Sequence, residues 1–278
     1  MIDSHCHLNF KAFNDDWREV ANRAFLGGVD AIVNVGSDLA TSKKAIEIAL
    51  SPELVEGSSI KLFAAIGLHP IHVVGEKFDI ADYKKLFNGY SPTNNQSLIT
   101  NNKSPKAIVA IGEIGIDLYH NPNNLAAQRE VFTQFITLAN KHHLPVIIHN
   151  RNAGAEVLDV LSNHRPQYGG VMHFFSEDWE YAKKLFDIGL LISFTGSITL
   201  NNVDAKTIEV IKNAPLNKMM IETDAPYVVP EPMKSDGAKR NEPAFVVEVA
   251  KKIAEIKNLS FEKVSSQTIK NTSTLFGI

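Results

Sequence analysis

Short runs of consecutive apolar residues alternate along the chain with longer segments in which apolar residues recur every three or four positions. The short runs are typical of parallel strands with a covered outer face, and the longer pattern is typical of amphipathic helices. We interpret the short runs as eight strands, the first beginning at Ile2 and the others at 31–35, 62–66, 107–111, 145–148, 170–172, 190–194 and 218–221. Helix-like sequence follows each strand, so the pattern predicts an α/β fold, a (β/α)8 TIM barrel.

A single domain over residues 1–278 accommodates this barrel, because α/β barrels of this length commonly form one unit. A doubly wound open sheet is the alternative for such strand–helix repetition. The barrel is favoured because chemically active side chains follow five different strands, and a barrel gathers all strand ends around one mouth.

The segments between the strands carry helical stripes and turn signals. Predicted helices occupy 15–26, with Asp15 as N-cap, and then 126–141, 154–163, 177–188, 206–213 and 243–257, with a further helix closing the chain. Two polar segments, 51–59 and 91–105, interrupt the pattern and are predicted to be surface loops. Because each precedes a strand, both loops are expected at the end of the barrel away from the strand C-termini.

Composition narrows the class of protein and its partners. A formal net charge of −3 argues against a broad basic surface, so a nucleic acid would have to be held locally. One cysteine, Cys6, excludes an intramolecular disulfide and fits a reducing compartment. The sequence starts directly with a strand and has no apolar run of the ~18 residues that a membrane span requires. We therefore expect a cytoplasmic protein without a membrane or an obligate protein partner.

The first strand carries the clearest chemical signal. Side chains alternate between the two faces of a strand, so Asp3, His5 and His7 are expected on one face. Two imidazoles in this arrangement can bind one metal ion. The alternative is a pair of packed or solvated histidines, and the ligand interpretation requires further ligands from the rest of the chain.

Those further ligands occur at the C-terminal ends of other predicted strands, the end at which barrel enzymes place their catalytic groups. The candidate metal ligands are His5, His7, Glu113, His149, His173 and Asp224. Six ligands with one bridging carboxylate can hold two divalent ions, and Glu113 is the expected bridge because it comes from the middle of the array.

Several motifs resemble those of the TatD family of metal-dependent hydrolases, within the amidohydrolase-like barrels. They are Asp3-Ser4-His5-Cys6-His7-Leu8, Gly67-Leu68-His69-Pro70, Gly112-Glu113-Ile114-Gly115-Ile116-Asp117, the segment 144–149, Gly170-Val171-Met172-His173-Phe174-Phe175-Ser176, Glu222-Thr223-Asp224-Ala225-Pro226-Tyr227, and the segment 239–243. The resemblance spans the chain and implies the same six ligands. It also implies a divalent-metal-dependent deoxyribonuclease, a 3′ to 5′ exonuclease that acts on single-stranded DNA.

Two departures from the family pattern bear on substrate choice. Glu177 stands where the family usually has glycine, and the segment 231–238 is longer than usual. Neither departure removes a ligand, but Glu177 adds a negative charge near the expected mouth.

The charge of the expected site favours an anionic substrate. Two divalent ions together with ionised Glu113 and Asp224 leave a net charge of about +2. Asp224 is the expected general base, and its alternative is a plain ligand role. The imidazole-rich ligand set suits zinc, whereas magnesium prefers oxygen, so magnesium, manganese and zinc all stay open.

Four other side chains are candidates for substrate binding, namely His69, Arg151, Tyr227 and Arg240. His69 and Arg151 are expected near a phosphate, and Tyr227 is a candidate for stacking on a base. Each has a structural alternative, and for Arg240 that alternative is an ion pair with Glu242.

Two other function classes compete with the deoxyribonuclease. One is an amide or ester hydrolase of the amidohydrolase type, such as an aminoacyl ester deacylase; many such barrels bridge their ions with a modified lysine on the fourth strand, where this chain has Glu113. The other is a non-catalytic metal-binding or nucleic-acid-binding protein, which is less favoured because every ligand position is filled.

Overall fold

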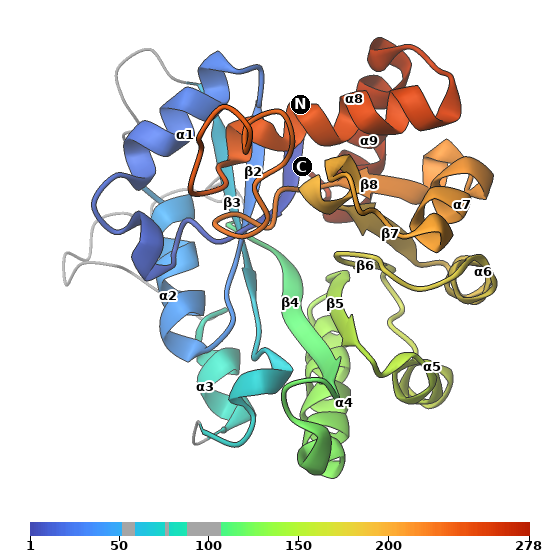
Figure 1. Cartoon of the computed structure of the whole chain (residues 1–278). Coiled ribbons are helices and arrows are strands. Elements are labelled where there is room, and N and C mark those ends of the chain that lie inside the picture. The colour runs from blue at the N-terminus through green and yellow to red at the C-terminus, as the bar shows by residue number, and fades with distance from the viewer. Residues whose placement is uncertain (52–58, 76–77, 88–106) are drawn as a thin grey trace.

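Eight parallel strands form one sheet in the computed structural model, in the order β1-β2-β3-β4-β5-β6-β7-β8 (Figure 1). The structure describes residues 1–51, 59–75, 78–87 and 107–278, so the predicted loop at 91–105 and nearly all of that at 51–59 lie outside the described residues. The strands are β1 Ile2–Cys6, β2 Ala31–Val35, β3 Lys61–Ile66, β4 Ile108–Asp117, β5 Val146–Arg151, β6 Gly170–Met172, β7 Leu191–Phe194 and β8 Met219–Ile221.

The sheet curves into a nearly closed barrel, which confirms the predicted fold. Backbone hydrogen bonds join its two edges, because Asp224 donates to the carbonyl of His5 at 2.9 Å and His7 donates to that of Ala225 at 2.8 Å. The segment after β8 is thereby fixed against the end of β1.

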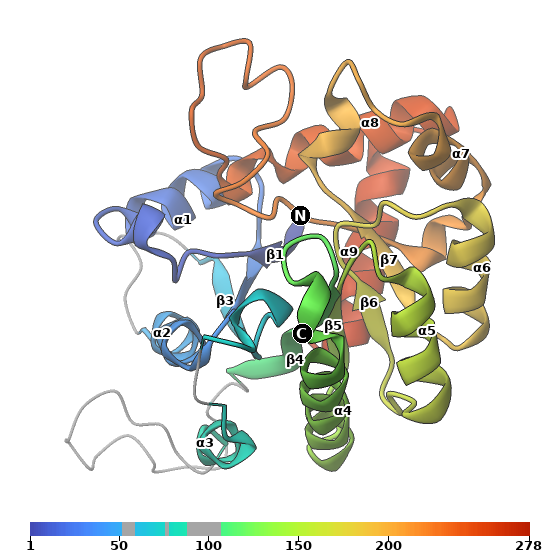
Figure 2. The same ribbon diagram turned by 60° about the horizontal axis from the view of Figure 1, so that its bottom comes forward.

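Helices surround the strands in the two views of Figures 1 and 2. They are α1 Trp17–Leu26, α2 Leu39–Ala49, α3 Ile80–Lys85, α4 Leu125–Lys141, α5 Gly154–Asn163, α6 Trp179–Asp187, α7 Ala205–Asn213, α8 Val246–Lys257 and α9 Phe261–Phe276. Among the described residues, no helix combines the length and the apolar character that crossing a bilayer would require.

Alternate strand residues pack into two different apolar clusters. Ile32 and Ile148 belong to the larger cluster that includes the helices, whereas Val33 and Ile147 belong to a smaller cluster that Phe276 of α9 joins. This division follows from the two-residue period of a strand, with one face toward the helices and the other toward the barrel interior. A residue two positions after an interior residue therefore also faces inward, and near the C-terminal end of a strand it faces the barrel mouth. His149, two positions after Ile147, is an example.

The predicted end of the fourth strand at Ile111 is wrong. β4 runs to Asp117 and pairs with β5 along this length, with an irregularity between Ile111 and Ile114. Gly115 permits this close pairing, because a Cβ atom there would lie 2.0 Å from the carbonyl oxygen of His149. Glu113 is consequently a residue within the strand and not one that follows it.

Some predicted helix starts are also wrong. α1 begins at Trp17 with Asp16, not Asp15, at the N-cap position, and the carboxylate of Asp16 makes no capping hydrogen bond because Arg240 binds it instead. The predicted 243–257 helix divides into a 3-10 turn, Pro243–Phe245, and α8. The segment 231–238 belongs to a long loop between β8 and α8, which lies beside α1 (Figure 2).

Candidate metal centre

The two histidines of the first strand face each other at the barrel mouth. His5 lies on β1 and His7 follows it directly, and their Nε2 atoms are 3.2 Å apart. Both side chains are buried. His7 Nδ1 lies 2.8 Å from the carbonyl oxygen of Val35, which fixes the ring so that Nε2 points toward His5.

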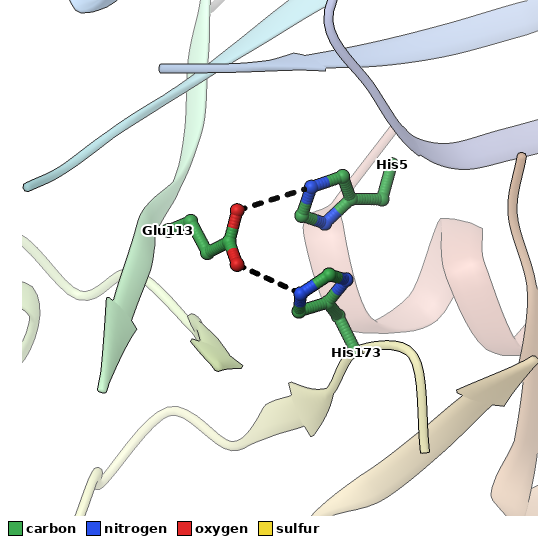
Figure 3. Close-up of side chains that lie close together, drawn as sticks. All are labelled: His5, Glu113 and His173. Atoms are coloured by element: carbon green, nitrogen blue, oxygen red, sulfur yellow. Dashed lines mark ion pairs between the residues drawn. The ribbon is translucent and has the colours of Figure 1, made fainter. Parts of the chain in front are cut away.

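Glu113 lies at the centre of the cluster, and its two carboxylate oxygens face different sets of rings. Oε2 is 3.5 Å from Nε2 of His5, and Oε1 is 2.8 Å from Nε2 of His173 (Figure 3). Oε1 is also 2.8 Å from Nδ1 of His149 and 3.2 Å from Nε2 of His69. This arrangement is what a bridging carboxylate needs.

Asp224 completes the side of the cluster that β1 forms. Its Oδ1 lies 3.3 Å from His7 Nε2 and 3.7 Å from His5 Nε2. The backbone of Asp224 has a φ of 55°, in the left-handed region that aspartate tolerates better than most residues. All six predicted ligands therefore converge around Glu113.

His69 joins the same cluster, although the sequence placed it among the substrate contacts. Its Nε2 lies 3.2 Å from His149 Nδ1. Among the described residues, His69, Glu113 and His149 form one of three groups whose ligand atoms all lie within 4.8 Å of one another. The other two groups are His5, Glu113 and His173, and His5, His7 and Asp224.

These donor groups fit divalent metal ions. Two nitrogen ligands at about 2.1 Å from one ion, at tetrahedral or octahedral angles, lie about 3.0–3.4 Å apart. The nitrogen pairs His5–His7 and His69–His149 are each separated by 3.2 Å. Imidazole donors suit zinc, and carboxylate donors suit magnesium or manganese, so the donor set is compatible with all three ions.

The ionisation of the cluster is set by burial and by contacts within it. Burial alone would raise the pKa of Glu113, but His173 and His69 lower it well below its usual range. Burial would likewise raise the pKa of Asp224, yet His7 and His5 lower it. Burial lowers the pKa of His69 to about 4, so this imidazole is neutral at pH 7 and its lone pair is available to an ion.

Two buried carboxylates that the sequence reasoning missed lie behind the ligands. Asp117 Oδ2 is 3.2 Å from His149 Nε2, and Glu222 Oε1 is 3.4 Å from His173 Nδ1. A ligand imidazole commonly has such a partner on its other nitrogen, which orients the ring and raises its basicity. The sequence does carry a signal for these two carboxylates. Asp117 and Glu222 lie in the motifs quoted above, at even spacing from Glu113 and Asp224, as expected for side chains on one face of a strand.

Comparison with known proteins identifies the family to which this chain belongs. The profile of the family described as TatD related DNase matches residues 2–277. The chain belongs to the TatD family. The uncharacterized metal-dependent hydrolase YabD of Bacillus subtilis is 35% identical over 280 residues, covering 100% of this chain and 99% of the relative.

Solved structures agree with this family and with the barrel. The TatD homologue YJJV of Escherichia coli has a TM-score of 0.83 and 26% identity, covering 100% of this chain and 98% of that one. An uncharacterized amidohydrolase of Saccharomyces cerevisiae has a TM-score of 0.76 and 20% identity, covering 99% of each chain, and shows the fold alone. The protein is thus a metal-dependent hydrolase of the TatD family with a (β/α)8 barrel.

Asp3 of this TatD-family protein shares the face of His5 but does not join the ligand cluster. Its carboxylate accepts hydrogen bonds from the backbone N–H and the hydroxyl of Thr223, at 2.9 and 2.5 Å. Burial raises the pKa of Asp3 to about 8. Asp3 therefore ties β1 to the segment that carries Asp224.

Arg240 is not brought to the ligands. Its guanidinium binds Asp16 at 2.6 Å and Glu242 at 2.9 Å, and it stacks on Phe13 at 4.4 Å. The structural alternative, an ion pair with Glu242, is what the structure shows.

Arg151 and Tyr227 lie close to the cluster and are exposed. Arg151 is the last residue of β5, two positions beyond His149. Tyr227 is 52% exposed and stands edge-on to His7, with ring centroids 6.3 Å apart. Glu177 also lies near this edge, because its Oε1 accepts a hydrogen bond from the side chain of Asn150 at 2.9 Å.

Proposed function

We propose that this TatD-family hydrolase is a deoxyribonuclease that removes nucleotides from the 3′ end of single-stranded DNA. The observation that carries this proposal is the position of Glu113, whose two oxygens each face separate imidazole sets at the barrel mouth. Two ions held there would stabilise the charge that develops on a phosphodiester and lower the pKa of an attacking water. The description of the matched family, TatD related DNase, supports the same chemistry.

The ligand set divides naturally between two positions. His5, His7 and Asp224 would hold one ion and Glu113 would bind both. The other ion would be held by His69, His149 and His173, which all lie within 3.2 Å of Oε1 of Glu113. The imidazole-rich composition supports zinc, while magnesium and manganese stay candidates.

Asp224 is the proposed general base. The side chain of Asp224 is 12% exposed, whereas that of Glu113 is 4% exposed, so Asp224 is the more accessible of the two carboxylates. Its lowered pKa keeps it anionic at neutral pH. In the proposed reaction its carboxylate accepts a proton from the attacking water while the water oxygen bonds to phosphorus. The bond between phosphorus and the 3′ oxygen of the preceding nucleotide breaks, and that oxygen takes a proton from solvent and leaves as a 3′-hydroxyl.

A strand end is the proposed substrate because the mouth offers few cations. The formal net charge is −3, and Arg240, one of the two predicted arginines, is already paired with Asp16 and Glu242. A duplex would need a longer basic track than this. The single, buried Cys6 supports the cytoplasm as the place of action.

An amide or ester hydrolase is the competing proposal, since the barrel is shared with proteins called amidohydrolases. Glu113 occupies the position on β4 where many such enzymes are expected to have a modified lysine, which favours the phosphodiester substrate.

The test uses end-labelled single-stranded DNA, linear and covalently closed, with added magnesium, manganese or zinc and with products resolved by size. We expect mononucleotides from linear strands, no cutting of circles and no product in chelator. Glu113→Ala should abolish cleavage, while Glu255→Ala, which removes an exposed carboxylate on α8, should leave it unchanged. No cleavage with any metal, or rapid cutting of circles, would overturn the proposal.

A further inference from the structure

An exposed aromatic–cation pair stands at the rim of the metal centre. The guanidinium carbon of Arg151 lies 4.4 Å from the centroid of the Tyr119 ring. Tyr119 is 59% exposed, and Arg151 is exposed as well. The two residues are neighbours because β4 and β5 pair to their ends, with Asp117 opposite Arg151.

Asp117 connects this pair to the ligands. Its Oδ1 accepts hydrogen bonds from the backbone N–H groups of Tyr119 at 2.9 Å and His120 at 2.7 Å. Its Oδ2 lies 3.2 Å from Nε2 of the ligand His149. One buried carboxylate therefore holds both a ligand ring and the turn that presents Tyr119.

Arg151 also points to the side of β5 that carries the ligand. It follows His149 by two positions, so both side chains leave the same face of the strand, with Cα atoms roughly 6–7 Å apart. This spacing, together with the contact of the guanidinium with the exposed Tyr119 ring, places Arg151 beside the cluster.

The charge of Arg151 is available to a substrate. In the part of the chain that the structure describes, no carboxylate pairs with Arg151, whereas Arg240, Arg23 and Arg129 each have an acidic partner. Its contact with Tyr119 covers one face of the planar guanidinium and keeps the group in place without neutralising it.

We propose that Tyr119 and Arg151 form a stacking platform for the nucleobase next to the scissile phosphodiester of a single strand. The inference rests on the proposed deoxyribonuclease function and extends it to a binding subsite. Guanidinium planes and aromatic rings stack on nucleobases, and every base offers a π-face, so such a platform accepts any sequence. The positive charge of Arg151 would at the same time attract the neighbouring phosphate.

The experiment compares two single-stranded oligonucleotides with phosphorothioate linkages that resist cleavage, one with all bases and one abasic at the residue before the terminal linkage. Binding is measured by fluorescence anisotropy with metal present, and kcat and KM are measured on cleavable versions of both. The wild type should bind the complete oligonucleotide about five- to 150-fold more tightly than the abasic one.

The variants separate stacking from charge. Tyr119→Ala and Arg151→Met should bring the ratio of the two affinities, complete over abasic oligonucleotide, close to one. Both variants should raise KM with little change in kcat, while Tyr119→Phe should keep the affinity ratio. Arg151→Lys should retain the salt dependence of binding but lose the ratio. Arg18→Met is the matched control, because Arg18 also lies over an aromatic ring, that of Trp17 at 4.3 Å, but on α1.

Equal affinity of the wild type for both oligonucleotides would overturn the platform, as would a ratio that survives in Tyr119→Ala. If the affinity ratio is lost in Tyr227→Ala and kept in Tyr119→Ala, the base binds on the other side of the mouth, which would also overturn the platform. Failure of the wild type to bind or cut either oligonucleotide would refute the deoxyribonuclease proposal and the platform together. Normal cleavage without a base-dependent ratio would refute the platform alone.

Discussion

Glu222→Gln should weaken metal binding without unfolding the protein. The carboxylate of Glu222 is fully buried and accepts hydrogen bonds from the Phe174 backbone N–H and the Ser193 hydroxyl, each at 2.7 Å. A glutamine can keep its oxygen on Phe174 and donate its amide to the Ser193 oxygen, so these two hydrogen bonds survive. The charge that faces His173 Nδ1 at 3.4 Å is lost.

The size of the effect follows from the role of Glu222 behind a ligand. Loss of a carboxylate that orients a ligand imidazole costs about 10- to 100-fold in metal affinity, or about 1.4–2.7 kcal/mol. Competition with a chromophoric chelator measures this affinity, and nitrogen-15 NMR of histidine reports the protonated ring nitrogen of His173. Glu255→Gln on α8 is the control for removing a carboxylate.

Metal affinity equal to that of the wild type, in a variant that folds normally, would refute this role of Glu222. The role would also be refuted if His173 carried its proton on the same ring nitrogen in Glu222→Gln and in the wild type.

Two further predictions concern the framework of the site. Gly115→Ala should lower the free energy of unfolding by about 1–3 kcal/mol in urea denaturation, because its Cβ would lie 2.0 Å from the His149 carbonyl; unchanged stability and metal affinity would contradict this. Arg240→Met should destabilise the protein at pH 7. Arg240 hydrogen-bonds Asp16 and lowers the pKa of that carboxyl. Burial would raise the pKa of Glu242, but Arg23 and Arg240 lower it. Both groups add stability above their ordinary pKa values near 4 and lose it as the pH falls, so the difference from wild type should shrink in acid, and a constant difference would argue against ion pairing.

The sequence predicted which six candidate ligands the structure brings together, because the two-residue period of strands governs where their side chains point. His5 and His7 share a face, and the later candidates lie on or after strands whose C-terminal ends the barrel directs to the same mouth. The order of the motifs therefore sufficed to gather six residues from five separate segments of the chain.

Other features depend on contacts that local pattern does not carry. β4 extends past Glu113 because Gly115 lets it pair closely with β5, and an apolar run alone does not reveal that pairing. His69 joins the ligands only when the third and fifth strands lie on one barrel. Arg240 pairs with Asp16 across 224 residues, which no local reading could predict.

Metal titration of the chelator-treated protein, with cleavage of single-stranded DNA followed in the same samples, tests the central claim most directly. We expect the stripped protein to be inactive, activity to return as two divalent ions bind per chain, and Glu113→Ala to lose both metal binding and cleavage. Full cleavage in the stripped protein, or metal binding and cleavage that survive in Glu113→Ala, would contradict a bridged two-ion centre at this site.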